Sequence, residues 1–131
     1  MSKDYTILLL EDEPLILMDL ELAGEDRDCT MISTPACGEA LAAIEEGHGI
    51  DVAILDVSLG GRETCVPVAD KLRECGIPFV LHSGDLDRHQ ERVRTLEAPL
   101  IPKPAAAEKV IAAAIALLEE GEAGSVPLVA E

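Results

Sequence analysis

Five polar residues stand at or just beyond the ends of short apolar runs in this sequence. They are Glu11, Asp12, Asp56, Ser83 and Lys103. Three carboxylates brought within a few ångströms repel one another, so a cation must offset them. Mg²⁺ suits such oxygen donors, and it typically takes one or two carboxylates, several waters and a phosphate oxygen. With a lysine and a hydroxyl beside it, this set could hold a phosphoryl group next to a carboxylate nucleophile that forms an acyl phosphate.

The apolar runs have the length and composition of strands that are buried on both faces, as in a parallel sheet. We expect five strands, at residues 5–10, 30–34, 51–55, 78–81 and 98–101. Five predicted helices alternate with them, at residues 14–26, 37–46, 64–75, 86–96 and 105–120. Pro14 suits the first turn of the first helix, and Gly47 and Gly76 suit the ends of the second and third.

This alternation predicts an α/β fold in which parallel strands are joined by crossover helices. The sheet should be open, with helices on both faces and a ligand site beyond the carboxyl ends of its strands. We therefore expect the five polar residues to converge on one edge of the sheet. Residues 1–120 would form the single domain, and residues 121–131 a flexible C-terminal tail.

Composition narrows the classes of function. The 131 residues favour one domain, and because 48% are hydrophobic but only 2% aromatic, its core must be aliphatic. The net charge of −16 disfavours nucleic acids and anionic membrane surfaces, which are bound through Lys and Arg. No apolar run approaches the roughly 20 residues that span a bilayer, and the start of the chain lacks a signal-peptide core. We therefore expect a cytoplasmic protein.

The cysteines and histidines show no spacing typical of metal ligands. Because no Cys-x-x-Cys pair occurs, we expect small buried thiols rather than a zinc or redox site. The cysteines are Cys29, Cys37, Cys65 and Cys75. We expect the histidines to lie on the surface or in loops. They are His48, His82 and His89.

Four short motifs, in register with the strand–helix units, resemble the receiver domain of bacterial two-component response regulators. They are Leu10-Glu-Asp-Glu13, Ile54-Leu-Asp-Val57, Ser83-Gly84 and Lys103-Pro104. The resemblance covers about residues 5–120 and is to the stand-alone, single-domain type. It implies a flavodoxin-like (βα)5 doubly wound fold with a five-stranded parallel sheet of order 2-1-3-4-5.

The resemblance also implies roles for the acidic residues. Asp56 is expected to be the phosphorylation site. Asp12 and Asp56 would bind Mg²⁺ directly, together with the backbone carbonyl of Ser58, and Glu11 would act on the metal through water. The side chain of Ser58 stands where the family tunes the rate of dephosphorylation.

Further roles follow for the residues after the last two strands. By the same resemblance, Ser83 and Lys103 would contact the phosphoryl group, and the peptide bond between Lys103 and Pro104 would be cis. Asp85 stands at a second position that tunes dephosphorylation.

Three positions near these residues depart from the usual pattern of the family or match a variant of it. Leu100 replaces the usual aromatic switch residue three positions before the lysine. Gly84, after the hydroxyl residue, resembles a variant of stand-alone receivers. In the loop after the phosphorylation site, Gly60 replaces a frequent proline.

The function implied is a phosphoacceptor signalling module rather than an enzyme. A histidine kinase or a phosphotransfer protein would donate the phosphoryl group to Asp56. The signal would pass by contact with a downstream protein, and the receiver could act as a homodimer. Two alternatives stay open. An aspartyl-nucleophile phosphohydrolase could use a similar set, although Ser58 stands where such enzymes place a second aspartate. A phosphorylation-independent interaction domain of the same fold would need none of this chemistry. A fragment of a longer regulator or hybrid kinase also fits the sequence.

Overall fold

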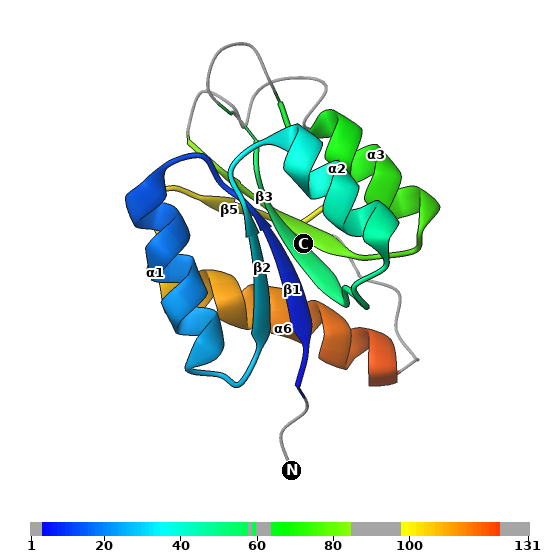
Figure 1. The fold of residues 1–131 in the computed structure, drawn as a ribbon. Coiled ribbons are helices and arrows are strands. Elements are labelled where there is room, and N and C mark those ends of the chain that lie inside the picture. The colour runs from blue at the N-terminus through cyan, green and yellow to red at the C-terminus, as the bar shows by residue number, and fades with distance from the viewer. Residues whose placement is uncertain (1–3, 58, 60–63, 85–97, 124–131) are drawn as a thin grey trace.

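The computed structural model describes residues 4–57, 59, 64–84 and 98–123, and these form an α/β fold around one parallel sheet (Figure 1). The sheet order is β2-β1-β3-β4-β5, and every neighbouring pair is parallel. The strands are β1 (Thr6–Leu10), β2 (Thr30–Thr34), β3 (Val52–Asp56), β4 (Phe79–Ser83) and β5 (Leu100–Pro102). The predicted flavodoxin-like fold and strand order are confirmed.

Helices cover both faces of the sheet. The described helices are α1 (Pro14–Glu25), α2 (Cys37–Glu46), α3 (Val66–Glu74) and α6 (Ala107–Ala123). Two of them, α1 and α6, pack on one face, while α2 and α3 pack on the other (Figure 1). The helix expected at residues 86–96 lies outside the described residues.

Alternate residues of the central strands belong to two separate hydrophobic cores, one on each face of the sheet. In β3, Ala53 and Leu55 face α2 and α3, whereas Val52 and Ile54 face α1 and α6. Because successive side chains of a strand point to opposite faces, a strand covered on both sides must be apolar throughout. This is why β3 appears in the sequence as an unbroken apolar run that stops at Asp56, the residue that reaches the edge of the sheet.

Element boundaries agree closely with prediction at the start of the chain and less closely after residue 78. The bounds of β2 and α2 are as predicted, and Gly47 ends α2 in the left-handed conformation with φ of 72°. By contrast, β4 continues two residues beyond Leu81, because its last residue, Ser83, pairs with Pro102 of β5. Helix α6 begins at Ala107 and runs past Gly121, a residue whose helical cost of about 1 kcal/mol is small for a long helix.

The four cysteines behave differently from one another. Cys29, Cys37 and Cys65 are buried, as predicted, but Cys75 is exposed, so the prediction is wrong there. Cys75 follows the last turn of α3, where its backbone N–H bonds to the carbonyl oxygens of Lys71 and Leu72. Its side chain lies outside the core. Among the described helices, none is long and apolar enough to cross a membrane.

Candidate functional site

The carboxyl edge of the sheet brings together residues that are far apart in the sequence. Asp56 ends β3, Glu11 directly follows β1 and Lys103 directly follows β5. The Lys103 Nζ lies 3.2 Å from Asp56 Oδ1 and 3.4 Å from Glu11 Oε1. Carboxylate oxygens of Glu11, Asp12 and Asp56 lie within 4.8 Å of one another. The predicted convergence of three acids and one lysine is therefore observed.

Local hydrogen bonds fix the acidic loop between β1 and α1. The Glu11 N–H donates to the Thr34 carbonyl at 3.1 Å, and this bond extends the pairing of β1 with β2 by one residue. The Glu13 N–H donates to Glu11 Oε2 at 3.2 Å, which orients the buried carboxylate. Pro14 then starts α1, in the first turn, where its missing N–H costs no helical hydrogen bond. Asp12 is left exposed at the mouth of the site.

Burial and crowding strongly perturb the protonation of Asp56. Desolvation is the main cause that raises the pKa of Asp56 to about 8, and repulsion from Glu11 adds to it, while Lys103 acts in the opposite direction. Burial by itself would lower the pKa of Lys103, but attraction to Asp56 and Glu11 outweighs burial and raises it. The lysine is thus a permanent cation, and it only partly offsets the acidic cluster.

The remaining predicted residues surround this cluster. Ser83 is fully buried at the end of β4, where its hydroxyl donates to the Gly84 carbonyl at 3.0 Å. The Lys103 N–H donates to the Ser83 carbonyl at 2.7 Å, so the two residues are held side by side. The peptide bond between Lys103 and Pro104 is cis, as the resemblance implies. Among the described residues, no atom lies within 4 Å of where a Cβ on Gly84 would stand.

Four other positions that the sequence singled out have different outcomes. Leu100 is half-buried in β5, where it pairs with Leu81 and packs against the core on the side of α2 and α3. Ser58 and Asp85 lie outside the described residues, as does Gly60, so their expected roles rest on the sequence.

His82 belongs to the site, although the sequence did not predict it there. The prediction that the histidines lie on the surface or in loops is wrong for this residue, which is 3% exposed within β4. Its Nδ1 lies 3.9 Å from Glu11 Oε1. The signal was available, because alternation along β4 places residue 82 on the same buried face as Val80. The prediction failed because β4 was expected to end at Leu81.

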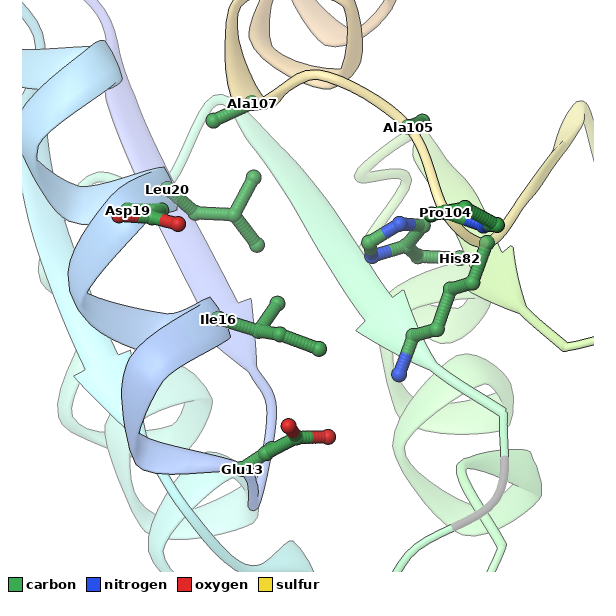
Figure 2. A pocket seen from close by; sticks show the side chains of 9 residues that line it. Glu13, Ile16, Asp19, Leu20, His82, Pro104, Ala105 and Ala107 are labelled. Carbon is green, nitrogen blue, oxygen red and sulfur yellow. The ribbon is translucent and has the colours of Figure 1, made fainter.

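A cavity of about 380 Å³ opens beside this histidine. Figure 2 shows the His82 ring pointing across it toward Ile16 and Leu20 of α1, with Pro104 and Ala105 on the same side as the histidine. Glu13 and Lys103 also line the cavity, which therefore borders the acidic cluster directly.

The donor set at the edge of the sheet fits Mg²⁺. Glu11, Asp12 and Asp56 supply only carboxylate oxygens, which are the hard donors that this ion prefers. Asp12 is exposed, so the ion could keep the bound waters that it gives up reluctantly. Burial and, to a smaller extent, repulsion from Glu11 raise the pKa of Asp56, and Lys103 offsets this only in part, so a bound cation would favour the ionised carboxylate.

Solved structures similar to this chain decide the family. SdrG from Sphingomonas melonis Fr1 is 42% identical, with a TM-score of 0.74 over 91% of this chain and 99% of SdrG. A response regulator receiver protein from Sinorhizobium medicae WSM419 is 24% identical, with a TM-score of 0.79 over 89% of this chain and 96% of that one. This chain belongs to the response regulator receiver family.

More distant receivers share the same architecture. A CheY-like receiver domain protein from Methanospirillum hungatei JF-1 is 19% identical, with a TM-score of 0.78 over 94% of this receiver and 100% of that chain. No protein-family model and no curated protein matches the sequence. The family therefore rests on the 42% identical relative, the shared fold and the residues at the edge of the sheet.

The metal-free receiver should lose stability as the pH rises toward 8. The pKa of Asp56 is 3.8 ordinarily and about 8 when folded, so between these values the folded state holds a proton that the unfolded state has lost. The stability from this proton is complete below the lower value and is lost as the pH rises through the upper one. We expect unfolding in urea to show a loss of roughly 1–3 kcal/mol between about pH 6 and about pH 8.5.

The variant Asp56→Asn provides the control, because its amide does not titrate. This variant should show a flatter profile, and millimolar Mg²⁺ should restore stability to the native receiver at the higher pH, since a ligand that binds only the folded state stabilises it. Equal pH slopes for both proteins without metal would contradict the assignment of the raised pKa to Asp56.

Proposed function

We propose that this receiver accepts a phosphoryl group on Asp56 from a histidine kinase or a phosphotransfer protein, using Mg²⁺, and that it signals by contact with a downstream protein. The observation that supports this most directly is the double contact of Lys103 with Asp56 and Glu11, at distances of 3.2 and 3.4 Å. A fixed cation beside a buried aspartate, within a cluster of metal-binding acids, is suited to the charge of a phosphoryl group in transfer.

In the proposed reaction, a carboxylate oxygen of Asp56 attacks the phosphorus atom of a phosphohistidine. The phosphorus–nitrogen bond breaks, and the donor imidazole leaves with the electron pair and takes up a proton. Asp56 must be ionised to attack, although burial and Glu11 favour its protonated form. Mg²⁺, held by Asp12, Asp56 and the carbonyl of Ser58, would supply the positive charge that favours the ionised form and would neutralise the phosphoryl oxygens.

Other residues would act once the acyl phosphate has formed. We propose that Lys103 binds a phosphoryl oxygen and that the Ser83 hydroxyl turns from the Gly84 carbonyl to donate to another. Ser58 and Asp85 would set the rate of hydrolysis. Gly84, Leu100 and Pro104 would form the switch region, with the half-buried Leu100 in place of an aromatic side chain.

The acid-rich composition supports the proposed partners. At a net charge of −16, this receiver is suited to protein partners in the cytoplasm, and neither nucleic acid nor an anionic membrane is proposed as a ligand. Residues 1–120 are proposed to act as one receiver domain, and of the segment 121–131 proposed as a tail the first three residues continue α6.

The test is chemical phosphorylation followed by intact mass spectrometry. We expect acetyl phosphate or phosphoramidate with Mg²⁺ to add one phosphoryl group per chain, which hydroxylamine removes as it does other acyl phosphates. The label should not form after chelation of the metal. Stable stoichiometric labelling supports a signalling receiver, whereas continuous release of phosphate from phosphomonoesters would favour the phosphohydrolase. No labelling by either donor or by purified kinases would overturn the proposal.

A further inference from the structure

The buried imidazole of His82 has no hydrogen-bond partner within the described part of the chain, at either ring nitrogen. Its side chain is 4% exposed, and it lines the cavity beside the acidic cluster. A buried polar group left without a hydrogen bond costs about 1–3 kcal/mol, and an apolar residue would avoid that cost. An unpaired imidazole at this position therefore calls for a function.

A candidate partner of His82 is the carboxylate of Glu11, which is itself incompletely bonded. Glu11 Oε2 accepts the Glu13 N–H, but Oε1 has no hydrogen-bond partner among the described residues. Oε1 is instead approached by two groups, Lys103 Nζ at 3.4 Å and His82 Nδ1 at 3.9 Å. In this arrangement the lysine attracts the carboxylate electrostatically, and the histidine lies too far away to donate a normal hydrogen bond to it.

The proposed phosphorylation would remove a stabilising contact from the carboxylate of Glu11. Lys103 would turn to a phosphoryl oxygen, and its contact with Glu11 Oε1 would weaken or break. Glu11 is only 2% exposed, so its Oε1 would lose the nearby ammonium group while it stays buried, and only the Glu13 N–H and the metal would then hold the carboxylate in place. A buried oxygen that loses its partner costs free energy, and the cost is larger for a charged group.

We propose that His82 is a positioning residue. When Lys103 turns to the phosphoryl group, the Nδ1–H of His82 donates a hydrogen bond to Glu11 Oε1 and keeps this carboxylate in place. This inference rests on the proposed function and deepens it. Closing the distance of 3.9 Å to a hydrogen bond of about 2.9 Å needs a movement of roughly 1 Å. The adjoining cavity of about 380 Å³, which His82 lines together with Lys103, leaves room for both side chains to move (Figure 2).

The imidazole would act in its neutral form. Burial, with a smaller contribution from the Lys103 ammonium, lowers the pKa of His82 to about 4. The ring therefore adds no charge that would compete with the metal, and it requires only the tautomer with its proton on Nδ1. A neutral donor can hold Glu11 in place without reducing the negative charge that Glu11 offers to the metal.

Three variants separate hydrogen bonding from space filling. His82→Leu removes the donor and keeps an apolar side chain of similar reach. His82→Asn places an amide N–H₂ at the same bond distance from the backbone as Nδ1, whereas His82→Gln places one at the distance of Nε2. We expect the rate of phosphoryl acceptance from phosphoramidate, at saturating Mg²⁺, to fall about tenfold in the Leu and Gln variants and to stay within about threefold of the native rate in the Asn variant.

A second readout distinguishes positioning from a general structural role. Lys103 still holds Glu11 in the unphosphorylated protein, so the Mg²⁺ affinity of that state should be the same in all four proteins. A His82→Leu rate equal to that of the native receiver, or an Asn variant as slow as Leu, would overturn the inference. If the native receiver takes up no phosphoryl group, the proposed function itself fails, so the two failures are distinct.

A measurement on the native protein does not depend on the folding of any variant. The protein is labelled with ¹⁵N-histidine, and beryllofluoride with Mg²⁺ serves as the phosphoryl mimic. We expect the mimic to bring out a slowly exchanging Nδ1–H signal for His82, shifted toward the position of a charge-assisted hydrogen bond. A ring signal that is unchanged by a mimic that demonstrably binds would overturn the inference.

Discussion

Replacing Asp56 by asparagine is expected to abolish phosphoryl labelling of the receiver by acetyl phosphate, phosphoramidate or a phosphorylated kinase. The amide lacks the anionic oxygen that attacks phosphorus, and no acyl phosphate can form on it. Asp56 is also one of the three acids that could bind the metal, so the variant loses both the nucleophile and a ligand. Intact mass spectrometry measures the loss directly as the absence of the phosphorylated species.

Asp51 supplies a matched control on the same segment of the chain. It stands just before the amino end of β3, and its Oδ2 accepts the Thr6 N–H at 2.8 Å, a bond that an asparagine oxygen can keep. We expect Asp51→Asn to be labelled like the native receiver. Native labelling of Asp56→Asn would move the phosphorylation site elsewhere, and loss in both variants would point to a general effect on folding.

Replacing Lys103 by methionine should slow phosphoryl acceptance by about 100-fold or more, the usual cost of removing one fixed group that stabilises the transition state. Methionine keeps most of the apolar stem of lysine and removes the ammonium group that lies 3.2 Å from Asp56 Oδ1. The developing charge on the phosphoryl oxygens then lacks its only nearby side-chain cation among the described residues. Single-turnover labelling at saturating Mg²⁺ gives the rate.

The variant Lys71→Met is the matched control for Lys103→Met, because it also replaces a lysine by methionine. Lys71 forms an ion pair of 3.6 Å with Glu45 on the face of the sheet that α2 and α3 cover, at a partly exposed position. Such pairs contribute about 0–1 kcal/mol, so Lys71→Met should leave both stability and labelling nearly unchanged. Circular dichroism on both variants with Mg²⁺ shows whether they are folded. Equal rates for Lys103→Met and the native receiver would refute the role given to Lys103.

The first half of the fold could be predicted from the sequence because its signals are local. Strands β1 and β3 are buried on both faces, and their apolar runs end where Glu11 and Asp56 reach the edge of the sheet. Helix α2 ends at Gly47 because a glycine readily adopts the left-handed backbone that closes the helix. The order of these segments, with the resemblance to receivers, was enough to predict the strand order and the acidic cluster.

The second half was harder to predict because its boundaries depend on pairing between segments. The sequence after Leu81 is polar and resembles a loop, yet His82 pairs with Ile101 and Ser83 with Pro102 when β5 lies alongside β4. This long-range pairing buries a histidine that sequence alone assigned to the surface. It also places His82 beside Glu11, a contact between residues that are far apart in the chain.

The sequence by itself determined which residue types reach the edge of the sheet, because apolar runs specify buried strands and polar residues mark where those strands end. Only the tertiary structure decided how these groups affect one another. The raised pKa of Asp56 and the double contact of Lys103 depend on desolvation and on distances of 3 to 4 Å between different strands. Electrostatic energies change steeply over such distances, and spacing along a chain does not encode them.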